Sequence, residues 1–400
     1  MFANGDVLIQ KFGGSSMGSV ERITRVAERI AARAARGNRM VVVVSAMGDT
    51  TDDLIELMNK VTPVPDRREL DNVMATGEMV SASLMASALA RLGIRARSYN
   101  AFNLHLLSEL QGDDYNIVQI GRRNNLARFL EPGSVAVVAG FQGITADGDL
   151  TTLGRGGSDL TAVILARELG QKVCEKYTDE DGIYTADPRI IPDARKVWHL
   201  DYEEMLTLAA FGNGILHPRA VSSARDCEIR IHVRSSFSQA EGSVVGPDGD
   251  DQIPVKSITC DNRLVYTRIH GLTQPDAEFM RELQEQPFTP VMMQWKPYNQ
   301  MAGSLRIGFR RADSFAALPF CWEQAHRLGA EEVDCYANLS TISLVGCGLR
   351  NNPELAASFA AGLNSVTPMI EQHDGIRLSF AVEKSQVKPA LEALHQTILG

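Results

Sequence analysis

The chain has 400 residues, 44% of them hydrophobic, which is enough apolar material for two or three packed domains. Its formal net charge of −9 at pH 7 argues against nucleic acid or an anionic membrane surface as a partner. We find no N-terminal signal peptide and no apolar run that approaches the length of a membrane span. The six cysteines form no CxxC pair, and no histidine cluster has metal-ligand spacing. We therefore expect a cytoplasmic protein with reduced thiols.

The N-terminal segment predicts a strand, a glycine-rich loop and a helix in that order. Residues 6–12 are a short apolar run, Gly13-Gly14-Ser15-Ser16 follows, and an apolar face predicts a helix from about Ser19. The loop lacks the Gly-Lys-[Ser/Thr] ending of a Walker A motif and the third glycine of a dinucleotide fingerprint. Lys11 instead ends the strand. A lysine there is more often a solvated strand end, but the adjacent glycines and hydroxyls favour a phosphate-binding role.

Strands and helices alternate through roughly the first 240 residues, which predicts an open α/β sandwich. Beyond the first strand, the predicted strands are residues 39–45, 134–140, 172–177 and 229–234. The predicted helices are residues 19–36, 50–60, 70–92, 118–130 and 160–169. Ligands of such folds bind beyond the carboxyl ends of the strands, where we expect the first glycine loop, a second one at 151–159 and Ser45-Ala46-Met47-Gly48 to lie.

A second glycine-rich turn, Thr151–Asp159, leads directly into the predicted helix at 160–169. Backbone N–H groups and the helix dipole make such a turn an anion site. Arg155 within the turn can form paired hydrogen bonds with a carboxylate or a phosphate, and Asp159 adds an opposite charge at the helix start. Taken alone, an ordinary turn capped by Ser158 or Asp159 explains the pattern equally well.

The pattern changes after a stretch rich in Gly, Pro and Asp at 241–254, which predicts a linker. The first series beyond it predicts a strand at 264–272, a helix at 275–286, strands at 290–295 and 304–309, a helix at 312–328 and a strand at 332–336. The second predicts a strand at 341–345, a helix at 353–363, strands at 366–370 and 376–382, and a helix at 385–398. Two such β-α-β-β-α series predict tandem ferredoxin-like domains, which would dimerise or sense a small ligand.

Seven blocks of the sequence, in chain order, resemble the aspartate kinase family. They are Lys11–Ser16, Val43–Asp52, Ala75–Glu78, Gly140–Gly143, Thr151–Asp159, Tyr177–Arg189 and Leu216–Arg219. The match runs through roughly residues 7–245, and together these blocks are far more specific than one glycine motif. The C-terminal pair is similar, less faithfully, to the tandem ACT domains of that family.

The resemblance implies an amino-acid-kinase three-layer α/β/α sandwich followed by two ferredoxin-like (ACT) β-α-β-β-α-β domains. The implied limits are 1–245 for the catalytic domain, 246–262 for a linker and the first ACT-associated strand, and 263–337 and 338–400 for the ACT-like domains. ACT-like domains pair edge to edge, so we expect a homodimer or a larger assembly, with a possible amino-acid effector at these domains.

The resemblance also implies a reaction in which ATP and L-aspartate give 4-phospho-L-aspartate and ADP, toward lysine, threonine and methionine or in a specialised pathway. The accepting side-chain carboxylate, with a pKa of about 4, is ionised at neutral pH and needs no general base. The site must then supply positioning and charge neutralisation, which suits glycine amides, lysine and hydroxyls. Mg²⁺ would bridge the phosphates mainly through water and phosphate oxygens, and no side chain is assigned as its ligand.

The family's residue roles transfer to this chain position by position. Lys11 and Asp159 are implied as catalytic residues. The implied substrate-binding residues are Ser45, Thr51, Glu78, Arg155, Gly156, Gly157 and Ser158. The implied nucleotide-binding residues are Lys11, Phe12, Gly13, Gly14, Ser15, Thr178, Asp179, Tyr184 and Arg189. Arg155 would hold the α-carboxylate of aspartate and Glu78 its α-ammonium, while Asp159 would orient the ammonium or support Mg²⁺.

Two departures from the family pattern affect the expected activity. Many members carry a phosphate-holding lysine at the position of Gly214, and Lys176 or Arg189 is a candidate to supply that charge. The first ACT-like domain lacks the usual turn at 271–276, and neither domain has the usual ligand-contacting strand at 291–300 or 366–370. We therefore expect weakened feedback inhibition, against the alternative that a divergent sequence forms the same effector pocket.

Two alternative functions remain. One is another amino-acid or carbamate kinase on the same scaffold, although Glu78 and Arg155 together favour a zwitterionic amino acid over carbamate. The other is a catalytically silent regulatory subunit, which would have no physical need for intact loops around Lys11 and Arg155. We expect His217, directly before a proline, to be structural.

Overall fold

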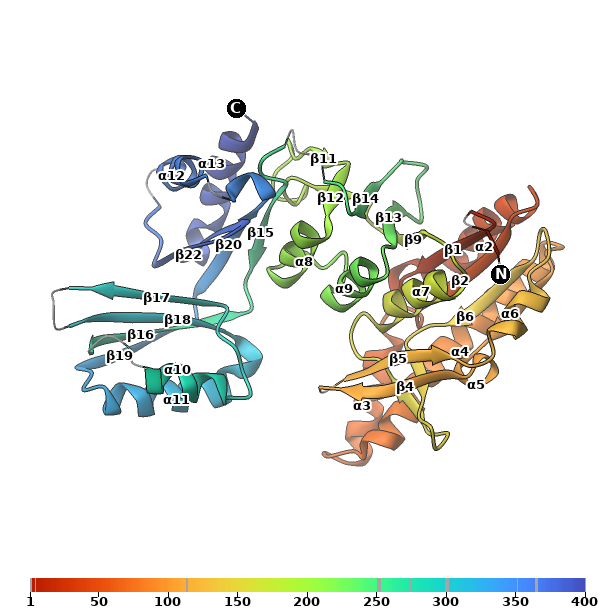
Figure 1. Cartoon of the computed structure of the whole chain (residues 1–400), viewed down its shortest axis with the longest axis horizontal. Coiled ribbons are helices and arrows are strands. Elements are labelled where there is room, and N and C mark those ends of the chain that lie inside the picture. Colours follow the sequence, from red (N-terminus) through yellow and green to blue (C-terminus); the bar gives the residue numbers. More distant parts are fainter. Residues whose placement is uncertain are drawn as a thin grey trace. The chain divides into compact units, whose positions relative to one another are not determined.

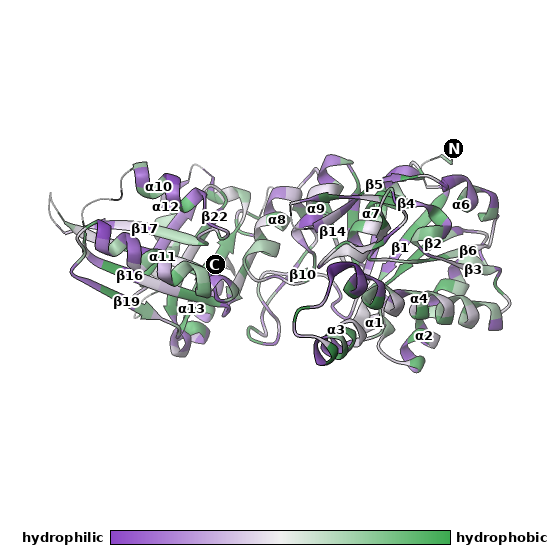
Figure 2. Cartoon of the chain, turned by 90° about the horizontal axis from the view of Figure 1, so that it is seen from below, coloured by the Kyte–Doolittle hydropathy of each residue, from purple (hydrophilic) through white to green (hydrophobic). Residues whose placement is uncertain are grey.

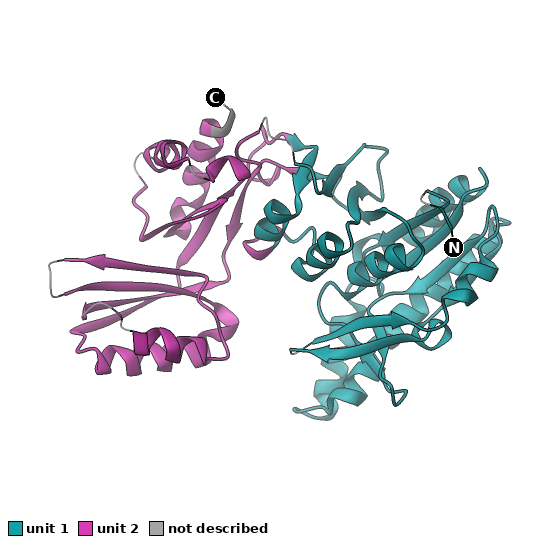
Figure 3. Ribbon diagram, in the orientation of Figure 1, with its two compact units in different colours: residues 1–183, 196–209, 214–250 teal, residues 184–195, 210–213, 251–400 magenta. Residues whose placement is uncertain are grey.

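The computed structural model of the chain describes residues 2–3, 5–112, 114–249, 253–272, 275, 277–298, 302–350, 352–363 and 366–399. They divide into two compact units (Figure 3). The first comprises Met1–Ile183, Lys196–Ala209 and Gly214–Asp250, and the second comprises Tyr184–Arg195, Ala210–Asn213 and Asp251–Gly400. Parts of the predicted turn at 271–276 and of the segment 291–300 lie outside the described residues.

The first unit is built on an eight-stranded sheet with the strand order β12-β14-β13-β9-β1-β2-β6-β3 (Figure 1). Its strands are β1 (Val7–Phe12), β2 (Arg39–Val44), β3 (Ala96–Tyr99), β6 (Val135–Ala139), β9 (Val173–Thr178), β12 (His199–Asp201), β13 (Arg230–Ser235) and β14 (Ser243–Gly246). β1 pairs in parallel with both β2 and β9, so the carboxyl ends of these central strands lie at one edge of the sheet. That edge is where ligands of α/β sheets bind.

Helices cover both faces of this sheet, which confirms the predicted three-layer sandwich. On one face, α2 (Val20–Ala34) and α4 (Arg67–Arg91) bury their apolar residues against β1, β2 and β6. On the other, α7 (Gly157–Glu168) contacts β1, β2 and β9, and α9 (Pro218–Asp226) packs beside it. The continuous apolar run of β2 follows from burial on both faces, and these central strands are coloured hydrophobic in Figure 2.

The remaining elements of the first unit surround this core. They are α1 (Gly14–Met17), α3 (Thr50–Val61), α5 (Ala101–Leu104), α6 (Arg123–Phe129) and α8 (Tyr202–Ala210), the last of which ends at the first residue of a second-unit segment. A four-stranded sheet, β5-β4-β7-β8, joins β4 (Leu106–Gln111), β5 (Asp114–Ile120), β7 (Gln142–Ile144) and β8 (Leu150–Thr152). A separate two-stranded sheet joins β10 (Ile183–Tyr184), whose second residue belongs to the second unit, and β11 (Lys196–Val197).

Two sequence predictions are wrong in this unit. The helix expected at 118–130 begins only at Arg123, because residues 118–120 complete β5, which pairs with β4 in a hairpin that turns at Gly112 with φ of +65°. The linker expected at 241–254 contains β14, which pairs antiparallel with β13 in the large sheet. In both cases the pairing partner, rather than the local pattern, decides the structure.

One helix of the described residues, α4, is long and apolar enough to cross a membrane by length and composition alone. It packs against α2, β3, β6 and β8 within the first unit. Two acidic residues of this helix, Asp71 and Glu78, are buried. Core helices of folded proteins pass the same test, so length and composition alone do not make α4 a membrane span.

The second unit contains two four-stranded sheets with two helices each. The first, in the order β17-β18-β16-β19, joins β16 (Leu264–Leu272), β17 (Met292–Pro297), β18 (Gly303–Arg310) and β19 (Glu332–Tyr336), with α10 (Ala277–Gln284), η1 (Arg311–Asp313) and α11 (Ser314–Arg327). The second, in the order β15-β20-β22-β21, joins β15 (Ser257–Asp261), β20 (Leu339–Val345), β21 (Ile370–Asp374) and β22 (Arg377–Glu383), with η2 (Cys347–Leu349), α12 (Pro353–Gly362), η3 (Lys384–Gln386) and α13 (Val387–Leu399).

Both sheets have the strand order of a ferredoxin-like domain, as predicted. The second takes its remaining edge strand from β15, which precedes the whole first domain in the sequence and pairs with β20. The first ferredoxin-like domain is therefore inserted into the second. The strand expected at 366–370 is wrong by several residues, since β21 begins at Ile370.

Candidate active site

The first glycine loop lies at the carboxyl edge of the large sheet, where the loops after β1 and β2 touch. The Gly48 amide donates to the Gly14 carbonyl at 3.1 Å, and a Cβ added at Gly14 would lie 3.1 Å from the Gly48 oxygen. Glycine is therefore needed for this close approach. The loop is not the plain loop expected from the sequence, because residues 14–17 form the short helix α1.

A charged cluster of Lys11, Lys176 and Asp159 lies beside this loop. Lys11 and Lys176 are register partners on the parallel strands β1 and β9, so their side chains share one face of the sheet. Asp159, in the first turn of α7, forms an ion pair with each of the two ammonium groups. Its Oδ1 lies 2.6 Å from Lys11 Nζ and its Oδ2 lies 2.5 Å from Lys176 Nζ. A Cβ added at Gly13 would lie 3.5 Å from Lys11 Nζ, which places that ammonium beside the loop.

The cluster is buried, and burial acts on each of its charges. Burial alone would raise the pKa of the Asp159 carboxyl, but the ammonium groups of Lys11 and Lys176 outweigh it and hold the pKa at about 2. Burial also lowers the pKa of Lys176, although Asp159 opposes that change. Asp159 is therefore ionised throughout the physiological pH range and holds both lysines in place.

Glu78 lies buried in the middle of α4, where the helix passes the loop after β2. Its Oε1 accepts the Ala46 amide at 3.0 Å, whereas Oε2 has no hydrogen-bond partner among the residues that the structure describes. Burial raises the pKa of Glu78 to about 7, against weaker lowering by the Ala46 amide. A Cβ added at Gly77 would lie 2.9 Å from the Ala46 Cβ, so a glycine brings the helix this close. An ammonium group would supply the partner that Oε2 lacks.

The second glycine turn presents Arg155 to solvent at the start of α7. Gly154 and Gly156 have φ of +71° and +77°, in the left-handed region that favours glycine. A Cβ added at Gly156 would lie 2.3 Å from the His217 Cβ, so His217 packs directly against the turn. His217 also caps α9, since its Nδ1 accepts the Arg219 amide at 3.4 Å.

The predicted nucleotide-binding residues divide between the two units. Three of them meet where β1 and β9 end, because Ser15 Oγ and Thr178 Oγ1 donate to Asp179 Oδ1 at 3.3 and 3.0 Å. The Phe12 ring is fully buried against Tyr177, so Phe12 has only its backbone to offer a ligand.

Tyr184 and Arg189 belong to the second unit, where Arg189 forms an ion pair with Asp187 at 2.9 Å.

Two predicted substrate-binding residues, Ser45 and Thr51, lie in the segment that runs from the end of β2 into the first turn of α3. The Ser45 amide donates to the Phe12 carbonyl at 3.1 Å, which places Ser45 beside the end of β1. Thr51 is a half-buried residue in the first turn of α3. Ser158 packs against Gly140, where an added Cβ would lie 2.7 Å from the Ser158 Cβ.

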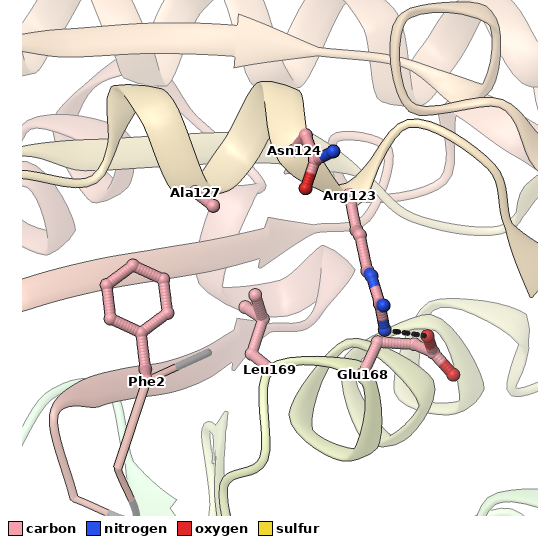
Figure 4. Close-up of a pocket in the computed structure, with 6 residues that line it drawn as sticks. All are labelled: Phe2, Arg123, Asn124, Ala127, Glu168 and Leu169. Atoms are coloured by element: carbon pink, nitrogen blue, oxygen red, sulfur yellow. Dashed lines mark ion pairs between the residues drawn. The ribbon is translucent and has the colours of Figure 1, made fainter.

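A pocket elsewhere on the first unit contains none of the predicted site residues. It lies between α6 and the C-terminal end of α7 and is lined by Phe2, Arg123, Asn124, Ala127, Glu168 and Leu169 (Figure 4). Its one drawn ion pair joins Arg123 and Glu168 at 3.9 Å. Nothing in this lining matches the chemistry of the glycine loops.

Comparison with known proteins settles the family. The amino acid kinase family matches residues 6–235 of this chain. The aspartokinase of Bacillus sp. (strain MGA3) is 36% identical over 398 residues, which cover 98% of this chain and 96% of that relative. The chain belongs to the aspartokinase family. Two crystal structures of E. coli aspartokinase III, one with aspartate and ADP and one with lysine and aspartate, each have a TM-score of 0.78 to this chain.

These two structures are 19% and 20% identical to the chain, cover 98% and 99% of it and are themselves covered completely, at 100%. At that identity they show the fold alone, and they agree with the sandwich and the ferredoxin-like domains described above. Membership of the aspartokinase family confirms the resemblance found in the sequence blocks.

The structure pairs Lys176 with Asp159, whereas the sequence had offered Lys176 only as a candidate to supply a positive charge. The signal was present in the sequence, because Lys11-Phe12 and Lys176-Tyr177 both place a lysine before an aromatic residue near the end of a buried strand. The buried contact between Ser16 Oγ and Ser236 Oγ, at 2.6 Å, had no such signal.

Proposed function

We propose that this chain is an aspartate kinase that transfers the γ-phosphoryl group of ATP to the side-chain carboxylate of L-aspartate. The observation that carries the proposal is the buried lysine–aspartate cluster beside the first glycine loop, with Glu78 near it. The aspartokinase relatives, one crystallised with aspartate and ADP, support the same reaction. The products would be 4-phospho-L-aspartate and ADP.

The reaction needs no proton transfer. The bond between the γ-phosphorus and the β–γ bridging oxygen breaks and leaves its electron pair on ADP, while a carboxylate oxygen of aspartate bonds to phosphorus. Lys11 and the amides of Gly13 and Gly14 would neutralise the charge of the moving group. We assign Asp159 to positioning the lysines, since both of its oxygens are already engaged by ammonium groups.

The substrate would be held through its α-carboxylate and α-ammonium groups. Arg155 is exposed and suited to form paired hydrogen bonds with the α-carboxylate, backed by the amides of Gly157 and Ser158. Glu78 would pair with the α-ammonium through its unpartnered Oε2. We propose Ser45 and Thr51 as neighbouring substrate contacts, and Ser15, Thr178, Asp179, Tyr184 and Arg189 as nucleotide contacts.

The donor set fits Mg²⁺ that arrives bound to ATP better than a resident metal site. Asp159 is the carboxylate of the buried cluster, and two ammonium groups occupy its oxygens. Among the described residues, neither grouping of possible metal ligands includes a residue of the two glycine loops. Mg²⁺ would therefore be held mainly by phosphate oxygens and water, where it would neutralise phosphate charge.

The alternatives are weaker on physical grounds. A carbamate kinase would have no use for Glu78, because carbamate carries no ammonium group to satisfy its buried Oε2. A silent regulatory subunit would bury the lysine–aspartate cluster without benefit, since buried ion pairs add little stability.

The whole chain suggests a regulated assembly. We propose the domain limits 1–245, 246–262, 263–337 and 338–400, a homodimer or larger assembly through the ferredoxin-like domains, and a cytoplasmic location. E. coli aspartokinase III has been crystallised with lysine, which supports an amino-acid effector at these domains. We propose that feedback inhibition here is weakened.

A substrate panel tests the proposed function. The purified protein is incubated with Mg²⁺, ATP and hydroxylamine, and with aspartate, glutamate or N-acetylglutamate in separate reactions. We expect acyl hydroxamate and matching ADP release with aspartate only. Turnover with another acceptor would identify a different amino-acid kinase, and no turnover with any acceptor would favour the regulatory subunit.

A further inference from the structure

Lys176, the second lysine of the buried cluster, is not required as a counter-ion for Asp159. Lys11 alone would neutralise Asp159, and a single ion pair would leave no net charge in the cluster. Lys176 adds a second ammonium whose side chain is only 11% exposed. Cys174, which lines the same small cavity, does not offset it, because burial raises the pKa of its thiol and keeps it neutral.

The three side chains of the cluster therefore carry one positive charge in excess when Asp159 is ionised, and Glu78, whose pKa burial raises to about 7 despite the opposing charge of Lys11, offsets that excess only in part. Burying an unmatched ammonium is strongly unfavourable unless a further anion approaches it. Each ammonium has three donors; Lys176 Nζ donates one to Asp159 Oδ2, and Lys11 Nζ forms an ion pair with Asp159 Oδ1. Among the described residues we find no other hydrogen-bond partner for Lys11 Nζ or Lys176 Nζ, so further donors on each remain available.

The first glycine loop lies beside these donors. Lys11 Nζ lies 3.5 Å from where a Gly13 side chain would begin, and Lys176 is the register partner of Lys11 on the adjacent strand. A group held by the loop amides and by Lys11 thus comes within reach of Lys176. The group with the right charge is the phosphoryl group in transfer, whose equatorial oxygens carry negative charge.

We propose that Lys176 is a second catalytic lysine, which contacts the transferred phosphoryl group together with Lys11 while Asp159 positions both. The inference rests on the proposed function. It also accounts for Gly214, where many aspartate kinases carry a lysine. Leu216, two residues further on, lines the same cavity as Lys11, Asp159 and Lys176, so the two positions approach one site from different elements.

Replacing Lys176 by methionine tests the proposal. Methionine keeps the length and apolar stem of the side chain, and the Lys11–Asp159 pair remains neutral. We expect kcat to fall by about 100-fold or more, the size of effect seen when one preorganised donor to transition-state charge is removed. KM for aspartate should change little and the melting temperature should not fall. Lys172→Met is the matched control, because Lys172 directly precedes β9 and pairs with Glu228 at an exposed position.

A second variant tests the proposal by moving the positive charge from position 176 to position 214. A Cβ added at Gly214 would meet nothing within 4 Å, so a side chain fits there. We expect Lys176→Met/Gly214→Lys to recover at least about tenfold of the lost kcat, because the positive charge returns to the site.

Three results would overturn the proposal. They are a Lys176→Met kcat within about threefold of wild type, a loss of kcat that accompanies a lower melting temperature, and a double variant no faster than Lys176→Met. A wild-type protein that forms no aspartyl hydroxamate would instead overturn the proposed function, so the two failures are distinguishable.

Discussion

Glu78 combines a buried carboxyl, a pKa raised to about 7 by burial and one oxygen without a partner among the described residues. A carboxylate in that state favours a ligand that brings a positive charge, because the charge stabilises the ionised form. Aspartate offers its α-ammonium. The ionised fraction of Glu78 should therefore control how tightly the substrate binds.

The first prediction concerns the pH dependence of aspartate binding. Below pH 7 the ionised fraction of Glu78 falls about tenfold per pH unit, so KM for aspartate should rise as pH falls from 7 to 5.5 and level off above 7. Glu78→Gln should raise KM by at least about tenfold and remove this pH dependence. Steady-state kinetics from pH 5.5 to 8 measure both.

The control is Glu69→Gln, which changes an exposed glutamate in the first turn of the same helix. It should keep the wild-type profile. A Glu78→Gln variant that retains the wild-type pH dependence would show that another group is responsible.

A second prediction at this scale separates Asp159 from Lys176. Asp159→Asn leaves two buried ammonium groups without a counter-charge, so it should lower the free energy of unfolding by about 3 kcal/mol or more. Lys176→Met leaves the neutral Lys11–Asp159 pair, so it should not lower the free energy of unfolding. Urea denaturation at pH 7 measures the difference, and equal stability of the two variants would contradict the assigned charges.

The pH dependence of this contribution follows from the lowered pKa. Asp159 titrates at about 2 when folded, against an ordinary value of 3.8. Its contribution to stability is therefore fully present above pH 3.8 and is lost as pH falls toward 2. The stability difference between Asp159→Asn and wild type should shrink over that interval.

At the scale of elements, the site depends on close approaches between backbone segments. The loops after β1 and β2 touch at Gly14 and Gly48, α4 reaches Ala46 through Gly77, and the turn before α7 packs on His217 through Gly156. Each contact lacks room for a side chain. These glycines bring the proposed ligand-binding groups together, and the amide of Gly14 is itself a proposed phosphoryl contact.

Gly156→Ala tests this view. Gly156 and Gly93 share the same backbone region, with φ of +77° and +78°, but an added Cβ at Gly156 would lie 2.3 Å from His217 whereas Gly93 has nothing within 4 Å. Gly93→Ala should cost only the backbone strain of about 1–2 kcal/mol. Gly156→Ala should in addition raise KM for aspartate by at least about tenfold. Equal aspartate KM values in the two variants would contradict the packing argument.

Elements with a strong apolar pattern could be predicted from the sequence, whereas elements that depend on pairing with distant strands could not. β1, β2, β6 and β9 were expected within about two residues of their observed bounds, because strands buried on both faces are continuously apolar. β5 and β14 were missed because they gain their structure from pairing with other strands.

The same division holds for the site. Lys11, Glu78 and Arg155 were identified from sequence blocks, but the unpartnered oxygen of Glu78 and the pairing of Lys176 with Asp159 depend on strand register and burial. No local sequence pattern predicts strand register or burial of that kind.

At the scale of the whole molecule, the chain joins a unit that carries the glycine loops to a unit of two interleaved ferredoxin-like domains. The sequence at 271–276, part of which lies outside the described residues, departs from the turn that the family resemblance implies, and β21 begins only at Ile370. Effector binding should therefore be weak even if the assembly forms.

An effector titration tests that expectation. Kinase activity is measured with lysine, threonine and both together, each up to about 1 mM. We expect less than about twofold inhibition in every case, because a weakly formed pocket supplies little differential binding energy between active and inhibited states. Strong inhibition below that concentration would contradict the prediction and indicate an intact effector pocket.

The central claim is that the cluster around Lys11 transfers a phosphoryl group to aspartate. Aspartyl hydroxamate formation by wild type and Lys11→Ala, measured side by side with melting temperature, tests it most directly. Lys176 can still pair with Asp159 in the variant, so the fold should persist. We predict hydroxamate from wild type and a loss of at least about 100-fold in the variant at an unchanged melting temperature. Equal hydroxamate formation by the two proteins would contradict the account.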